Sequence, residues 1–344
     1  MKTTLYSLLA AAACGMALGQ TAYTNPVGYV SLGDTTSGQP AVKASTDVTV
    51  AIPLARTTEY AGAISDATTS TIQVSGSPGW VASPAVGSWV PGAASPYIVT
   101  INSGSQNGFV GLITANTSDT LTVTPISGTA AQLDSVVAGA TIQIQKAWTV
   151  SAFISPTSVP AGTRLLVYFG TTSGVNLVPN ATHQTNGTNW KIGPSTTDNT
   201  VLYPGESYVV RAGTTQIASL VVSGEVPLAN SRTYIDKITA NVGQDTRISF
   251  YGAGEEIIGN SGLVASLGIV NGDRLLAYNN NAAGVNKVPN ETLQYNGTDW
   301  KIGPSTVTTT YTLKSGRGYI LRRATTAPVG PIDWSDKPSY LPFP

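Results

Sequence analysis

Two segments of this chain are near-copies of each other, and this repeat constrains the fold more than any other feature. AGTRLLVYFGTTSGVNLVPNATHQTNGTNWKIGPS (residues 161–195) aligns without a gap on NGDRLLAYNNNAAGVNKVPNETLQYNGTDWKIGPS (residues 271–305), which begins 110 positions later. After one inserted residue the match continues from Gly205 (GESYVVRAGTT) and Gly316 (GRGYILRRATT). Self-similarity at a fixed spacing predicts two copies of one structural unit.

The first copy is predicted to carry an insertion. A weaker match by pattern places residues 47–60 over residues 245–257. Only 17 positions separate Ile257 from Arg274 in the second copy, whereas 104 separate Tyr60 from Arg164 in the first. We therefore expect an additional unit within the first copy.

Strand patterns occur along the whole chain. TIQVS, YIVTI, TLTVTP, ATIQIQ, SYVVRA and GYILRR alternate apolar with polar residues, and Gly, Pro, Asn or Ser bound them. The sequence predicts an all-β protein with two tandem related β-sandwich or barrel-like repeats of roughly 110 residues each and a small β-barrel inserted in the first. The predicted division is a signal peptide (1–19), the first repeat (20–61 plus 148–222), an inserted neutral β domain (62–147), the second repeat (223–325) and a Pro-rich tail (326–344).

The N-terminus has the pattern of a secretory signal peptide. MKTTLYSLLAAAACGMALGQ combines one lysine, an apolar run and small residues at the −3 and −1 positions before Gln20. A membrane anchor is the alternative, but the run is shorter than the roughly 20 residues that span a bilayer. A lipoprotein signal at Cys14 is a second alternative. Cleavage would remove the only cysteine and both methionines, so we expect a disulfide-free protein that is secreted or lies on the outer cell surface.

Charged side chains are scarce. They make up 10% of the residues, against about 25% in ordinary soluble proteins, and 18 basic residues balance 18 acidic ones. Nucleic acid is therefore not an expected partner, and neither is an anionic membrane surface or a membrane span. No lysine or arginine lies between Arg56 and Lys146, so the insertion lacks the charges that often protect edge strands.

The repeated hairpin contains a tryptophan in each copy. NGTNWKIG and NGTDWKIG place Asn-Gly between two strands, which predicts a two-residue type I′ turn because both central residues then need positive φ. Trp190 and Trp300 follow at matching positions. We interpret them as repeat-core residues, with exposure for stacking on sugar rings as the alternative.

The sequence predicts no catalytic, cofactor or metal site. His183 is the only histidine, and Leu293 occupies its position in the second copy. With no cysteine left after cleavage, the usual zinc ligand sets are excluded. Four acids are candidates for the carboxylate pair of a glycosidase: Glu255, Glu256, Asp273 and Glu291. We interpret them instead as solvated residues on a strand face or in a turn.

The order of motifs resembles a family of secreted β-repeat proteins of the Verrucomicrobia. The resemblance covers nearly the whole mature chain and depends on NPVGYVSL, VAIPLARTTEYAG, SGSPGW, the twin GVN and NGT segments, and the closing YILRR and IDWSDKPSYLPF. It implies export and an extracellular or envelope location, and it leaves the activity open.

A structural role is the preferred functional prediction. A neutral β-chain has many strand edges, which suits a non-enzymatic subunit of an extracellular filament, sheath or surface matrix, a homo-polymer joined by strand edges and terminal segments. The alternatives are a carbohydrate-binding cell-surface module without catalysis and, less favoured, a polysaccharide-active enzyme. Assembly candidates are Tyr23, Val27, Tyr29, Ile332, Trp334, Tyr340 and Phe343. Glycan-stacking candidates are Trp80, Trp89 and Tyr97.

Overall fold

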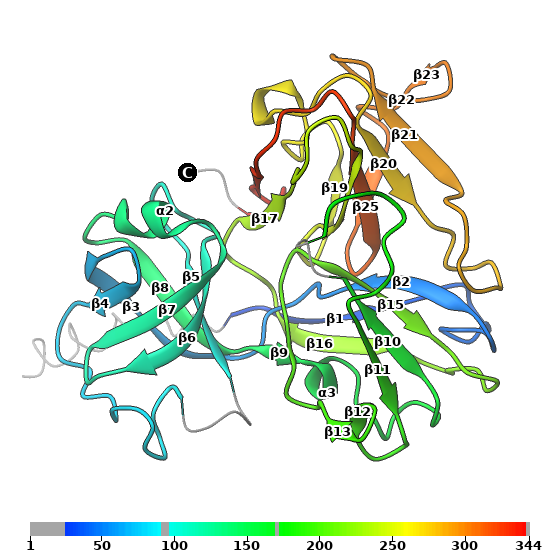
Figure 1. Ribbon diagram of the computed structural model, residues 1–344. Coiled ribbons are helices and arrows are strands. Elements are labelled where there is room, and N and C mark those ends of the chain that lie inside the picture. The colour runs from blue at the N-terminus through cyan, green and yellow to red at the C-terminus, as the bar shows by residue number, and fades with distance from the viewer. Residues whose placement is uncertain (1–24, 91–95, 169–171, 342–344) are drawn as a thin grey trace, which may run out of the picture.

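The computed structural model describes residues 25–90, 96–168 and 172–341, and almost all of its regular structure is β (Figure 1). The predicted all-β class is confirmed. Its helical elements are short: α2 (Ala130–Asp134), α3 (Val150–Phe153) and the 3-10 helix η1 (Ala265–Leu267). Across these described ranges, no helix combines the length and the apolar character needed to cross a bilayer.

Two six-stranded antiparallel sheets have the same strand order. The first runs β13-β12-β11-β10-β15-β2 and the second runs β23-β22-β21-β20-β25-β18. The first consists of β2 (Asp47–Ala51), β10 (Arg164–Val167), β11 (Ala181–Thr185), β12 (Trp190–Ile192), β13 (Ser195–Thr196) and β15 (Ser207–Arg211). The second consists of β18 (Gln244–Ser249), β20 (Arg274–Ala277), β21 (Glu291–Tyr295), β22 (Trp300–Ile302), β23 (Ser305–Thr306) and β25 (Gly318–Arg323). We call the parts built around these sheets the first and second sheet units.

Four two-stranded ladders complete the sheet units, and they also correspond between the two. In the first unit, β1 (Val27–Ser31) pairs with β16 (Val221–Glu225), and β9 (Trp148–Thr149) pairs with β14 (Val201–Leu202). In the second unit, β17 (Ser231–Ile235) pairs with β26 (Ile332–Asp336), and β19 (Glu255–Ile257) pairs with β24 (Thr312–Lys314). The first and last described strands of the chain therefore each pair within the chain.

The segment between β2 and β9 forms a closed barrel, at the left of Figure 1. Its strands are β3 (Thr58–Ala67), β4 (Thr71–Val74), β5 (Tyr97–Ile101), β6 (Val110–Asn116), β7 (Thr120–Ser127) and β8 (Thr141–Lys146), in the order β3-β4-β7-β6-β5-β8. The sequence did not predict β3 as a barrel strand, since TEYAGAISDA buries only Ile64 fully and has no clean alternation. Pairing of β3 with β8 closes the sheet, so this unit, which has no lysine or arginine between Arg56 and Lys146, protects its edges by closure.

The predicted two-residue hairpin turn is wrong. Thr185 pairs with Trp190, so the loop has four residues, 186–189. Gly187 has φ +91°, but Asn186 is not in the left-handed region that a type I′ turn requires. Its side-chain carbonyl instead accepts hydrogen bonds from the backbone N–H groups of Thr188 (3.0 Å) and Asn189 (2.8 Å), the arrangement of an Asx turn.

The tryptophans that follow these hairpins are fully buried. Trp190 packs in the core of the first sheet unit and Trp300 in that of the second. The Trp190 indole N–H donates to the carbonyl of Ile154 (2.8 Å), and that of Trp300 donates to the carbonyl of Leu263 (2.7 Å). Each large ring is therefore buried with its polar atom satisfied, as burial of a tryptophan requires.

A loop of the first sheet unit forms hydrogen bonds with an ion pair of the second sheet unit. Asp245 pairs with Arg322 (2.7 Å), and the Asn176 backbone N–H donates to the same carboxylate (2.8 Å). The Asn176 side-chain oxygen accepts from the Arg322 guanidinium (2.7 Å). Asn176 has φ +54°, a conformation that asparagine tolerates better than most residues. We call this arrangement the Asn176 clamp.

The reciprocal contact joins the units in the other direction. Asp47 pairs with Arg211 (2.6 Å) and accepts from the Asn286 backbone N–H (2.8 Å). The Asn286 side-chain oxygen accepts from Arg211 (2.6 Å), and its φ is +50°. In this Asn286 clamp, Asn286 of the second copy occupies the position that matches Asn176, and the ion pair belongs to the first copy. The repeated GVN motif is thus explained: each copy holds the other.

Candidate functional site

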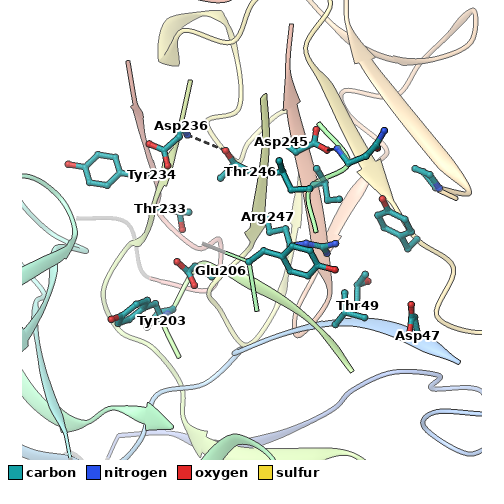
Figure 2. A pocket seen from close by; sticks show the side chains of 18 of the residues that line it. Asp47, Thr49, Tyr203, Glu206, Thr233, Tyr234, Asp236, Asp245, Thr246 and Arg247 are labelled. Carbon is teal, nitrogen blue, oxygen red and sulfur yellow. Dashed lines mark hydrogen bonds between the residues drawn. The ribbon is translucent and has the colours of Figure 1, made fainter. Parts of the chain in front are cut away.

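A cavity of about 620 Å³ lies where the two sheet units and the barrel meet. Its walls include Asp47 of β2, Arg247 of β18 and Ile320 of β25. The barrel contributes Ile126 and Ser127 of β7. Figure 2 shows its side chains converging from several elements. The volume lies within the roughly 300–1,000 Å³ typical of small-molecule sites, and a junction of domains is a common place for them.

Much of the lining consists of matching residues from the two copies. The pairs are Tyr168 with Tyr278, Asp47 with Asp245, Asn176 with Asn286, and Val209 with Ile320. Both clamps therefore stand in the cavity wall. Because each clamp contains a bidentate Asp–Arg pair, the walls that carry these residues are fixed in place.

Arg247 breaks this equivalence. Its guanidinium carbon lies 3.7 Å from the centroid of the Tyr168 ring, a close cation–π contact. Burial lowers the pKa of Arg247, and its Nη1 atom is buried without a hydrogen-bond partner. The matching residue in the first unit is Thr49, whose backbone N–H donates to the Asn280 side chain (2.9 Å). Thus the ring of Tyr168 is covered by a cation, whereas no guanidinium or aromatic ring among the described residues covers Tyr278.

Glu206 and Asp236 bring two carboxyl groups to another part of the wall (Figure 2). Burial raises the pKa of Glu206 to about 7, the Tyr208 hydroxyl opposes this by donating a hydrogen bond (3.2 Å), and the neighbouring charge of Asp236 adds to it. Burial also raises the pKa of Asp236. Within the part of the chain that the structure describes, neither carboxylate forms a salt bridge.

Four half-buried tyrosines supply most of the aromatic surface: Tyr168, Tyr203, Tyr234 and Tyr278. Burial is the main reason that the pKa of Tyr234 rises to about 12, and burial likewise raises the pKa of Tyr203 and Tyr278. Because their pKa values are raised, the phenols of Tyr203, Tyr234 and Tyr278 are neutral at physiological pH, and they offer ring faces together with hydroxyls that both donate and accept.

The acids singled out in the sequence do not meet in this cavity. Asp273 is not a solvated turn residue, because it is fully buried beside Arg323 (3.0 Å). Glu256 is also buried, and its carboxylate accepts from the Ser339 backbone N–H (3.0 Å). The described residues contain no group of three or more His, Cys, Asp or Glu side chains placed to hold a metal ion.

The assembly candidates are divided between surface and core. Val27 and Tyr29 of β1 are each 76% exposed, whereas Trp334 of β26 is 1% exposed. Trp334 packs in the core of the second sheet unit, with Ile332 packed against the same core. The prediction that Trp334 docks into a neighbouring molecule is therefore corrected. Trp334 is buried in its own unit, because β26 pairs with β17. Tyr340 is 36% exposed and donates to the Pro227 carbonyl. Tyr23 and Phe343 lie outside the described residues.

The predicted glycan-stacking residues form one aromatic cluster on the barrel. Trp80 and Trp89 meet edge to face at 5.8 Å, and Trp89 meets Tyr97 at 5.3 Å. Tyr60 completes the cluster, 4.9 Å from Trp80. Both tryptophans are half-buried and pack against the barrel core. Their ring faces are therefore partly occupied by one another, and the cluster is separate from the cavity lining.

Sequence reasoning missed the cavity residues. Arg247, Glu206 and Asp236 were not singled out, because no motif marks them. A usable signal was present where the copies differ: Thr49 matches Arg247, and Glu206 matches Arg317. Comparison with known proteins does not add to this, since no family model, curated protein or solved structure matches the chain.

Proposed function

We propose that this protein is an exported carbohydrate-binding protein without catalytic activity, which holds a sugar in the cavity between its two sheet units. The observation that carries the proposal is the lining: four half-buried tyrosines and two carboxyl groups without a salt bridge converge on about 620 Å³. The predicted signal peptide at residues 1–19 and the neutral composition support an extracellular ligand that is not a polyanion.

The chemistry of the lining suits a sugar. A sugar ring presents apolar C–H faces, against which tyrosine rings pack, and many hydroxyls, which carboxylates and phenols hydrogen-bond. Tyr278 offers the ring without a stacked cation, and Glu206 and Asp236 offer acceptors.

Calorimetric titration of the mature chain with soluble oligosaccharides tests the proposal. Tyr278→Ala is expected to weaken binding about tenfold, in line with the loss of one aromatic contact. The Trp80→Ala, Trp89→Ala double variant is the matched control, because it removes aromatic rings outside the cavity. Loss of binding in the double variant alone would move the site to the barrel cluster. Failure to bind any oligosaccharide would refute the proposal, and release of reducing ends would refute the absence of catalysis.

Self-assembly is the second candidate, and the β1–β16 ladder favours it. Val27, Tyr29 and Val221 are exposed on this ladder, at 76%, 76% and 53%. In the described structure β1 pairs with β16 alone, so its other edge is open to a strand from another molecule.

Light scattering and negative-stain micrographs of the concentrated mature chain test this second candidate. Assembly predicts polymers that persist in salt, because the contact is apolar. Tyr29→Lys is expected to abolish them, whereas Val86→Lys, at a 91% exposed position on the barrel segment, is the control and should not. A wild-type chain that stays monomeric at every concentration removes the candidate.

A further inference from the structure

The charges in the cavity indicate which kind of sugar it holds, an inference that rests on the function proposed above. Two of the acids in the lining already have cations: Asp47 pairs with Arg211 and Asp245 with Arg322. Arg232, also in the lining, pairs with Asp333. Glu206 and Asp236 are the carboxylates of the described lining that lack such a partner.

The two remaining cations of the lining are occupied elsewhere. The Arg247 guanidinium lies on the ring of Tyr168. The Lys287 ammonium donates to the carbonyls of Asn279 (2.7 Å) and Ala282 (3.1 Å). Among the described residues, neither cation forms a salt bridge with Glu206 or Asp236. The acidic part of the wall therefore has no compensating charge within the described protein.

Glu206 and Asp236 share one wall because β17 packs closely on the turn before β15. Gly205 has φ +83°, and a Cβ placed there would lie 1.8 Å from the Thr233 hydroxyl, so only glycine allows this approach. Thr233 is 6% exposed, lines the cavity, and its hydroxyl has no hydrogen-bond partner. Figure 2 shows Thr233 drawn between the two acids. The wall thus carries two uncompensated carboxyls and an unsatisfied hydroxyl.

We propose that the ligand is an amino sugar, whose ammonium group binds between the carboxylates of Glu206 and Asp236 while its ring packs on the cavity tyrosines. An ammonium has three donors and one positive charge, and it supplies both the hydrogen bonds and the counter-charge that this wall lacks. A half-buried carboxylate without a counter-charge is costly, so a bound cation is favoured at this position over a neutral hydroxyl.

The test compares two probes that differ only in charge, by calorimetric titration of the mature chain. One is the β-1,4-linked tetramer of glucosamine, and the other is the matching tetramer of glucose, with a hydroxyl in place of each ammonium. The glucosamine tetramer is expected to bind at least about tenfold more tightly. Glu206→Gln and Asp236→Asn are each expected to reduce this preference, and the double variant to abolish it. Glu255→Gln, at an exposed carboxylate of β19, is the control and should retain it.

The outcomes separate this inference from the proposed function. Equal binding of both tetramers overturns the amino-sugar assignment and leaves a neutral-sugar site. Binding of neither tetramer, nor of any other oligosaccharide, overturns both. A preference that survives in the double variant places the ammonium elsewhere and also overturns the assignment. Scanning calorimetry controls for misfolding: removing a charge from two acids of raised pKa is expected to increase the melting temperature.

Discussion

Replacement of Asp273 by asparagine is expected to destabilise the second sheet unit strongly. Asp273 and Arg323 are both fully buried, and their side chains lie 3.0 Å apart. Lys237, itself 2% exposed, is near enough for the charge of Arg323 to lower its pKa, after the larger effect of burial. Asp273 is therefore the one anion facing two buried cations. Without it, both positive charges remain in the core.

The expected cost follows from the burial of that charge. Removing one partner of a buried ion pair costs about 3–5 kcal/mol, because the other charge is left without compensation. The backbone N–H groups of Val270 (3.0 Å) and Ala324 (2.6 Å) donate to different oxygens of Asp273. Asparagine keeps the shape of the side chain but only one of these acceptors, so Asp273→Asn combines the uncompensated charge with the loss of one buried hydrogen bond.

The first sheet unit supplies the control for this prediction. Thr163 and Ala212 occupy the matching positions there, so the same core is built without an ion pair. Adding Arg323→Ala to Asp273→Asn removes the stranded guanidinium. The double variant is therefore expected to show a coupling energy of about 2 kcal/mol or more, making the pair of changes less costly than the sum of the singles.

Hydrogen exchange measured by mass spectrometry reports the local stability of each sheet unit separately. Peptides covering β20 and β25 are expected to lose protection in Asp273→Asn, while peptides covering β10 and β15 keep theirs. Global unfolding in urea gives the free energies for the double-mutant cycle. A loss below about 1 kcal/mol, or costs that simply add in the double variant, would refute this account of the buried pair.

Three further predictions concern other sites. Burial and the charge of Glu256 raise the pKa of Asp336 to about 7, so its contribution to stability is complete below its unfolded pKa of 3.8 and is lost as pH rises toward 7. Asp336→Asn should make the melting temperature less dependent on pH over this range. A pH dependence equal to that of the wild type would contradict the pKa shift. Asn286→Ala should cost about 1–2 kcal/mol in urea unfolding, since it removes a bond to Arg211 and strains a residue at φ +50°. Asn286→Gly should lower the free energy of unfolding less than Asn286→Ala, because glycine adopts this φ without strain. Equal losses in the two variants would exclude a contribution from backbone strain.

The sequence was a good guide to features that depend on local pattern. Alternation of apolar and polar residues located β4, β5, β7 and β8 within a residue or two, because side chains on a barrel wall alternate in and out. It missed β3, where the pattern is interrupted and closure of the barrel determines the pairing. It also misjudged the Asn-Gly hairpin, because the Asn186 side chain forms an Asx turn that competes with type I′ geometry.

The candidate site was less accessible to such reasoning. Glu206 and Asp236 lie 30 positions apart on different elements, and only the packing of β17 on the turn at Gly205 brings them to one wall. The prediction that Asp273 is a solvated acid is wrong because Asp273 is buried beside Arg323, which lies 50 positions away in the sequence. Non-local packing of this kind leaves no periodic pattern, whereas a comparison of the two copies position by position exposes the substitutions.

The exchange of Thr49 for Arg247 has a consequence for what the molecule can recognise. Two identical subunits related by a two-fold axis must present every side chain twice around that axis. Here both halves belong to one polypeptide, so the guanidinium of Arg247 stands on one flank of the cavity and the hydroxyl of Thr49 stands at the matching position on the other. A ligand bound there meets two unlike ends, and it can be held in one orientation only.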